Sequence, residues 1–266
     1  MNHWLRLTLI GALFLPLAAR ADDDAAARAS RWEGLRHDLF GDRQVRDGAD
    51  KIILDAPNRA EDAALVPVTI TVANPKDVRG VYLVIDDNPA PMAAHVKFGP
   101  AGDPQMLKLR VRVNQYTIMH AIEETNDGDL YETARFVKAS GGCSAPAGAY
   151  DEQALSDVGQ MKFRIAKTLN QDASVEAQLL IRHPNFNGMQ MDLTTRGYTP
   201  ARFLKTITAT YNGEKVWDID SDISLSTDPA ITFLVKPQKK GTLAVTAKDS
   251  DDVVFEQSFD LNQPGS

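Results

Sequence analysis

Cysteine is the residue of which this sequence has least: there is one among 266, Cys143. A single thiol excludes an internal disulfide, and it excludes every C-x-x-C metal or redox motif. Histidine is also scarce, and four of the five, His37, His95, His120 and His183, lie far apart with no H-x-x-x-H spacing. We therefore predict no metal site and no cofactor.

Several other signatures are missing. There is no phosphate-binding loop, no dinucleotide fingerprint and no G-x-S-x-G nucleophile elbow. There is no basic run either, and the formal net charge is −7. An acidic chain of this kind argues against nucleic acid and anionic lipid as partners. No stretch reaches the roughly 20 apolar residues that a membrane span needs, so no membrane association is predicted.

The first residues have the pattern of a secretory signal peptide. A basic start with Arg6 leads into an apolar run from Leu7 to Ala18, and Ala19-Arg20-Ala21 forms an A-x-A cleavage site. We expect residues 1–21 to be removed and the mature chain to be an exported, periplasmic protein. A lone cysteine in that compartment indicates a reactive thiol or a covalent partner on another molecule.

A helical pattern is followed by alternating ones. Apolar residues recur at helical spacing from Trp32 to Phe40, which predicts a short N-terminal helix over Ala25–Arg43 that Gly41 stops. After it, apolar and polar residues alternate, as in Val66–Val72 and Leu107–Val113. Alternation of this kind is typical of half-buried antiparallel strands.

Turn signals separate the expected strands. Hairpin turns are predicted at Asp127–Gly128 and Asn212–Gly213, and a further turn of this type at Asn187–Gly188. Later strands are expected in MKFRI, SVEAQLLIRHP, FLKTITATY, KVWDI, AITFLVKP, GTLAVTAK and VVFEQSFDL. Short strands with a turn signal about every ten residues, and no helices between them, favour an all-β sandwich fold.

The chain is long enough for two such sandwiches of roughly 100 residues each. We predict a first domain over 22–143 and a second over 161–266, which pack on one another. Residues 144–160 are small, polar and acidic without strand or helix periodicity, so they are predicted to be a linker.

Cys143 is the one distinctive reactive group. It follows the hairpin arm Leu130–Lys138, and its neighbours Gly141, Gly142 and Ser144 offer backbone freedom but little packing surface. We therefore expect an exposed thiol on a flexible arm, with a pKa near the unperturbed value of about 8.5. No histidine, helix N-terminus or second cysteine stands beside it to activate it, so no catalytic residue is predicted. The site is expected to be an attachment point for chemistry supplied elsewhere.

Longer stretches resemble a known family. LFGDRQVRDGADKIILDAPNRAEDAALVPVTITV, DDNPAPMAAHVKFGP and VKASGGC resemble the Y subunit of the Sox sulfur-oxidation carrier. LLIRHPNFNGMQMD and PARFLKTITATYNGEKVWDIDSDISLSTDPAITF resemble its Z subunit. In this order they are similar to the fused, quinoprotein dehydrogenase-associated SoxYZ-like carrier proteins. The resemblance implies two immunoglobulin-like β-sandwiches in the periplasm, with a substrate carried covalently on Cys143 of a glycine-rich arm.

Two functions remain open. One is a non-enzymatic carrier that holds a sulfur-containing or other thiol-linked intermediate for partner oxidoreductases. The other is an accessory binding module for a periplasmic quinoprotein dehydrogenase or its cytochrome, in which the cysteine is incidental. The resemblance implies the partners, which are Sox-type enzymes or that dehydrogenase and cytochrome.

A last expectation concerns the HPNFNG loop, residues 183–188. Its rigid proline and its Asn-Gly pair predict a tight turn at one end of the second sandwich. This turn either faces the first domain or is a plain strand-end turn.

Overall fold

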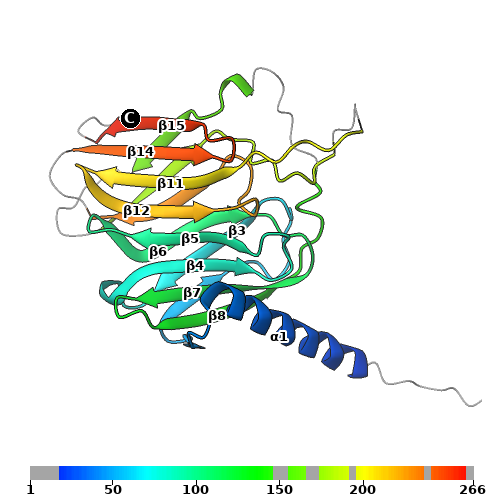
Figure 1. Ribbon diagram of the computed structural model, residues 1–266. Helices are drawn as coiled ribbons and strands as arrows, with labels where there is room; N and C mark the ends of the chain where they lie inside the picture. Colours follow the sequence, from blue (N-terminus) through cyan, green and yellow to red (C-terminus); the bar gives the residue numbers. More distant parts are fainter. Residues whose placement is uncertain (1–17, 146–154, 166–173, 192–195, 237–240, 262–266) are drawn as a thin grey trace, which may run out of the picture.

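The computed structural model describes residues 18–145, 155–165, 174–191, 196–236 and 241–261, with side chains from residue 25 onward. These residues form one long α-helix, a short 3-10 helix (η1, Pro75–Asp77) and two layered β-sheets (Figure 1). The larger sheet contains, in spatial order, β1 (Val45–Asp47), β8 (Leu130–Val137), β7 (Thr117–Thr125), β4 (Val78–Ile85), β5 (Met92–Phe98), β12 (Glu214–Ser221), β11 (Leu204–Tyr211), β14 (Thr242–Asp249) and β15 (Val254–Asp260). The smaller contains β2 (Ile52–Asp55), β3 (Val66–Val72), β6 (Gly102–Val111), β13 (Ala230–Val235), β10 (Val175–Ile181) and β9 (Met161–Ile165).

The all-β fold class predicted from the sequence is confirmed. Each expected strand of the second half is present, and alternation sets which side chains are buried: in Val66–Val72 every second residue is buried. Three strands had no clear alternating signal, namely β1, β2 and β5. β1 and β2 are only three and four residues long, and β5 buries Ala93 and Ala94 in succession, which breaks the period of two.

Each half of the chain is itself a two-layer sandwich, because each contributes strands to both sheets. The halves join where β5 pairs with β12 in the larger sheet and β6 pairs with β13 in the smaller, both antiparallel. The two sheets therefore run through both halves without a break, and one hydrophobic core fills the space between them. Trp217 and Phe233, both fully buried, meet edge to face in this core at 5.2 Å between ring centroids.

The predicted turns differ in outcome. Asn212 and Gly213 both have positive φ, 51° and 83°, as the predicted type I′ hairpin between β11 and β12 requires. Asp127–Gly128 closes the predicted β7–β8 hairpin, with Gly128 at φ 91°. The hairpin prediction for Asn187–Gly188 is wrong: this pair lies in a loop between β10 and β11, which belong to different sheets.

The helix α1 (Ala18–Phe40) begins earlier than the predicted Ala25 and ends before Arg43, at the predicted Gly41 stop. Gly41 stops it with φ 61°, and its N–H donates to the carbonyl of His37 at 2.8 Å. The helix packs Trp32, Leu39 and Phe40 against the outer side of β4, β7 and β8, and its N-terminal half projects away from the sandwich (Figure 1). No helix within the described ranges is long and apolar enough to cross a membrane. Most of the predicted signal peptide lies outside these ranges.

Candidate functional site around Cys143

The thiol loop, residues 139–145, follows β8 at the end of the sandwich where the loops before β11 also lie (Figure 1). The prediction of an exposed thiol is wrong for this structure. Cys143 is 1% exposed, while Ser144, the next residue, is exposed. The thiol is a free one, but it is enclosed at the junction of the two halves.

The two glycines before the thiol do not form a loose arm here. Gly141 has φ 82°, and its N–H donates to the carbonyl of Asn114 at 2.8 Å. Gly142 donates its N–H to the carbonyl of Val113 at 2.9 Å, and a Cβ at this position would collide with the carbonyl of Ala63. The glycines are therefore needed for a left-handed turn and a close backbone approach, and this is the physical reason that the thiol is buried rather than exposed.

The second half closes the other side of the thiol loop. Asn187, in the HPNFNG loop, donates from its side-chain Nδ2 to the carbonyl oxygen of Cys143 at 2.7 Å. Asn187 is itself only 5% exposed, so this hydrogen bond is buried. Of the two alternatives left open for the HPNFNG loop, this contact supports the one in which the loop faces the first domain.

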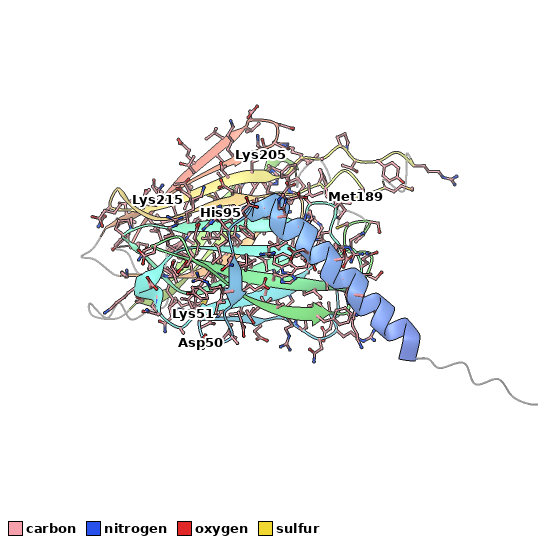
Figure 2. All side chains as sticks on the ribbon, turned by 60° about the horizontal axis from the view of Figure 1, so that its bottom comes forward. Asp50, Lys51, His95, Met189, Lys205 and Lys215 are labelled. Atoms are coloured by element: carbon pink, nitrogen blue, oxygen red, sulfur yellow. The ribbon has the colours of Figure 1, made fainter. Side chains whose placement is uncertain are left out.

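Asn187 is held in place from within its own loop. Its Oδ1 accepts the N–H of Met189 at 2.9 Å, and its own N–H donates to Oε1 of Gln190 at 3.2 Å. The first bond holds the side-chain amide, because Oδ1 is already engaged when Nδ2 reaches Cys143, and the second holds the backbone of Asn187. Met189, in the segment that follows the HPNFNG loop, lies on the right-hand side of the molecule (Figure 2).

The base of the HPNFNG loop is a buried polar network. His183 is fully buried; its Nδ1 accepts the N–H of Asn185 at 3.1 Å, and its Nε2 lies 3.6 Å from Oδ2 of Asp249. Burial lowers the pKa of His183, although contacts with Asn185 and Asp249 oppose this shift. Asn185 donates from Nδ2 to the carbonyl of Ser226 at 3.2 Å and accepts the N–H of Leu204 at 3.1 Å. The loop is therefore built on strand ends of the second half.

A second polar cluster supports the thiol loop from the first half. Asn88 donates from Nδ2 to the carbonyl of Arg112 at 2.7 Å and accepts the N–H of Asn114 at 2.9 Å. Arg112 is 1% exposed, and its guanidinium donates to Thr227 Oγ1 at 2.7 Å and to the carbonyl of Leu225. These bonds position the strand end whose carbonyls hold Gly141 and Gly142.

The surroundings set the acidity of the thiol. Burial raises the pKa of Cys143, and the charge of Arg112 opposes that shift without cancelling it. The predicted pKa near the unperturbed value is therefore wrong in this closed state. A raised pKa leaves less thiolate at neutral pH, and the thiolate is the nucleophile. In the closed state the thiol is both covered and weakly reactive.

The histidines do not gather into a site. Among the described residues no group of three or more His, Cys, Asp or Glu side chains is arranged to hold a metal ion. His120 lies far from the thiol in sequence, under α1, where its ring stacks on Trp32 at 3.6 Å between centroids. His95 stacks on Tyr82 at 3.9 Å, and Tyr82 in turn meets Phe40 of α1 edge to face at 5.1 Å. Both stacking contacts lie within the first half, and His95 also lies 3.8 Å from Asp220 of the second half.

Sequence reasoning identified Cys143 but not the residues that enclose it. Asn187 was part of a noted motif, and its Asn-Gly pair was assigned to a turn instead of to a contact. Asn88 and Arg112 carried no signal, because a polar residue beside a turn and an arginine in an alternating strand both predict surface positions. Only the fold brings them to the junction of the halves.

Comparisons with known proteins agree with this architecture. The family model of sulfur oxidation protein SoxY matches residues 36–143, and that of sulphur oxidation protein SoxZ matches residues 163–260. The chain is a SoxY domain followed by a SoxZ domain. The SoxY match ends at Cys143, the last residue of the GGC motif.

Among solved structures, the chain has a match to the sulfur carrier protein SoxY from Chlorobium limicola f thiosulfatophilum. It is 26% identical, with a TM-score of 0.38, and the match covers 44% of this chain and 98% of that one. A superoxide reductase (neelaredoxin) from Ignicoccus hospitalis is 18% identical with a TM-score of 0.29, covering 33% of this chain and 79% of that one. No curated protein matches the chain.

Proposed function

We propose that this SoxYZ-type chain is a periplasmic carrier protein, not a catalyst, that holds a sulfur-containing intermediate on Cys143 while partner oxidoreductases act on it. The observation that carries the proposal is the placement of the chain's one thiol at the end of the SoxY domain, enclosed by the SoxZ domain that follows. The signal-peptide pattern of residues 1–21 supports the periplasmic location.

The chemistry of such a carrier explains why it needs an oxidoreductase. Joining the Cys143 thiol to the sulfane sulfur of an anionic donor forms an S–S bond, and it releases one proton and two electrons. This chain has no second cysteine to take up those electrons. Among its described residues, no group of side chains is arranged to hold a metal ion that could do so. The electron acceptor must therefore belong to a partner, either a Sox-type enzyme or a quinoprotein dehydrogenase with its cytochrome.

Burial of the thiol fits the same role in two states. In the closed state observed here, Cys143 is shielded from oxidants and from other thiols. Loading and unloading then require the thiol loop to open. Among the described residues, few hydrogen bonds hold it closed against the rest of the fold: their donors are the N–H groups of Gly141 and Gly142 and the side chain of Asn187.

Burial also favours a second candidate function. A cysteine that is 1% exposed is equally compatible with a small buried core residue in an accessory binding module for a quinoprotein dehydrogenase. The two functions differ in whether a group is covalently attached to Cys143 in the cell.

The mass of the intact protein, purified from its native host without reductant, distinguishes them. A carrier is expected to show an added mass that a reducing agent removes, and the variant Cys143→Ala is expected to lack it. If the wild-type protein from sulfur-fed cells has only its unmodified mass, the carrier function is excluded and the accessory module remains.

A further inference from the structure

We propose that Asn187 of the second half is the positioning residue that keeps Cys143 closed, so that the SoxZ domain controls access to the thiol of the SoxY domain. This inference deepens the proposed function by naming how the site is regulated. It concerns access to the thiol and does not depend on which group the thiol carries.

The contact joins the two halves directly at Cys143. The Nδ2 of Asn187 reaches the carbonyl of Cys143 itself at 2.7 Å, across 44 positions of sequence. The first half holds the thiol loop only from before the cysteine, through the N–H groups of Gly141 and Gly142. After the cysteine, Ser144 bonds back to Gly141 within the same turn, through its N–H at 3.2 Å and its hydroxyl at 3.3 Å. Asn187 is therefore the side chain that ties Cys143 to a separate part of the fold.

The geometry of Asn187 is fixed before it meets the thiol loop. Oδ1 of Asn187 accepts the N–H of Met189, which leaves Nδ2 as the group aimed at Cys143. The loop beneath is tied to the second half by His183 and Asn185, which are both fully buried. Because Oδ1 is already bonded to Met189, the amide of Asn187 positions its partner more strictly than a mobile surface amide does.

Breaking this hydrogen bond costs free energy because it leaves the buried carbonyl of Cys143 without a donor. The Cys143 carbonyl is enclosed, so water does not replace Asn187 unless the loop moves. Removing the donor therefore shifts the loop toward its open state. The thiol loop should open locally, while both sheets stay intact.

The test is the rate at which Cys143 in the full-length protein reacts with the aromatic disulfide 5,5′-dithiobis(2-nitrobenzoate). Wild-type protein is expected to react slowly through local opening. Asn187→Ala is expected to react about tenfold faster, the shift in the opening equilibrium that follows from losing one buried hydrogen bond. The rate should depend little on low concentrations of urea, because local opening exposes little new surface.

Two variants make the result specific. Asn187→Asp keeps the Oδ1 that accepts from Met189 and replaces the Nδ2 donor with an acceptor, so it should also react faster; it serves if Asn187→Ala does not fold. Gln178→Ala removes an amide of the same half that donates to Thr232 at 3.1 Å, away from the thiol, and should react at the wild-type rate.

The proposal is overturned if both Asn187 variants react at the wild-type rate. It is also overturned if their faster reaction rises with urea as steeply as global unfolding does, because then Asn187 acts only through overall stability. A carrier without cargo in the cell would overturn the proposed function and leave this result unchanged, so the two failures are distinguishable.

Discussion

Gly142, the residue before Cys143, shows that a glycine in a sequence can be interpreted in two opposite ways. In the sequence, Gly142 indicates freedom and exposure, because glycine adds no side chain. In the structure the same lack of a side chain lets the backbone approach Ala63 so closely that no other residue fits. Local sequence does not distinguish these cases, since the difference lies in what the fold brings alongside. The site residue was thus predictable, and its environment was not.

Burial changes what substitution of the thiol should do to stability. Cys143→Ser places a hydroxyl where a thiol of low polarity is enclosed, and an unpaired buried hydroxyl costs about 1–3 kcal/mol. Cys143→Ala loses the sulfur and leaves a small cavity, at a cost of about 1 kcal/mol. We expect both variants to be less stable than wild type in urea unfolding, with the serine variant the lower.

Ser144→Ala is the matched control, because Ser144 is exposed and its substitution should stay within about 0.5 kcal/mol of wild type. A serine variant at position 143 as stable as this control would mean that the thiol is exposed in solution.

At the scale of elements, periodicity predicted the strands well and the helix contacts poorly. Strands such as β3 and β14 bury alternate residues, so the alternation in their sequence predicts which side chains are buried. The helical pattern from Trp32 to Phe40 predicted α1, but it could not predict the polar group under Trp32. That group is His120, which lies on β7 between two carboxylates from other strands and turns.

His120 should make the docking of α1 depend on pH. Its Nε2 lies 3.3 Å from Asp86 and its Nδ1 3.3 Å from Glu132, which also accepts the Trp32 indole N–H at 3.3 Å. Burial lowers the pKa of His120, but the hydrogen bonds and charges of Asp86 and Glu132 outweigh burial and raise it. A raised folded pKa means that this stabilisation is complete below the unfolded value of about 6.5 and is lost as pH rises through the folded pKa.

The free energy of unfolding of wild type minus that of His120→Gln, measured by urea titration at several pH values, checks this. The difference is expected to be largest in mild acid and to fall as pH rises. Arg31→Gln, which removes the ion pair between α1 and Asp87 at 2.7 Å and leaves His120 in place, is the control variant and is measured in the same way. A difference that does not change with pH would show that His120 does not gain a proton when the protein folds.

At the scale of the whole molecule, the sequence predicted two packed sandwiches, and the fold joins them more closely than packing alone would. The joint runs through backbone hydrogen bonds between β5 and β12 and between β6 and β13. Strand alternation predicts which face of a strand is buried, but not which strand becomes its neighbour. The pairing of strands between the two halves was therefore not predictable from the sequence beyond the resemblance to two separate subunits.

The joint predicts that residues 22–143 and 161–266, expressed as separate chains, associate tightly and fold best together. Each alone would leave two strand edges unpaired and part of the shared core exposed.

Gly102 is the position at which to test this joint, because a Cβ there would collide with the carbonyl of Val216 in the other half. We expect Gly102→Ala to weaken association of the two fragments by at least about tenfold, since relieving such a clash should cost on the order of 1–3 kcal/mol. Lys97→Ala, which removes only an exposed ion pair with Asp220 across the same joint, should change it by less than about fivefold. Sedimentation of the mixed fragments measures both, and fragments that remain monomeric when mixed would show that the continuous sheets do not form in solution.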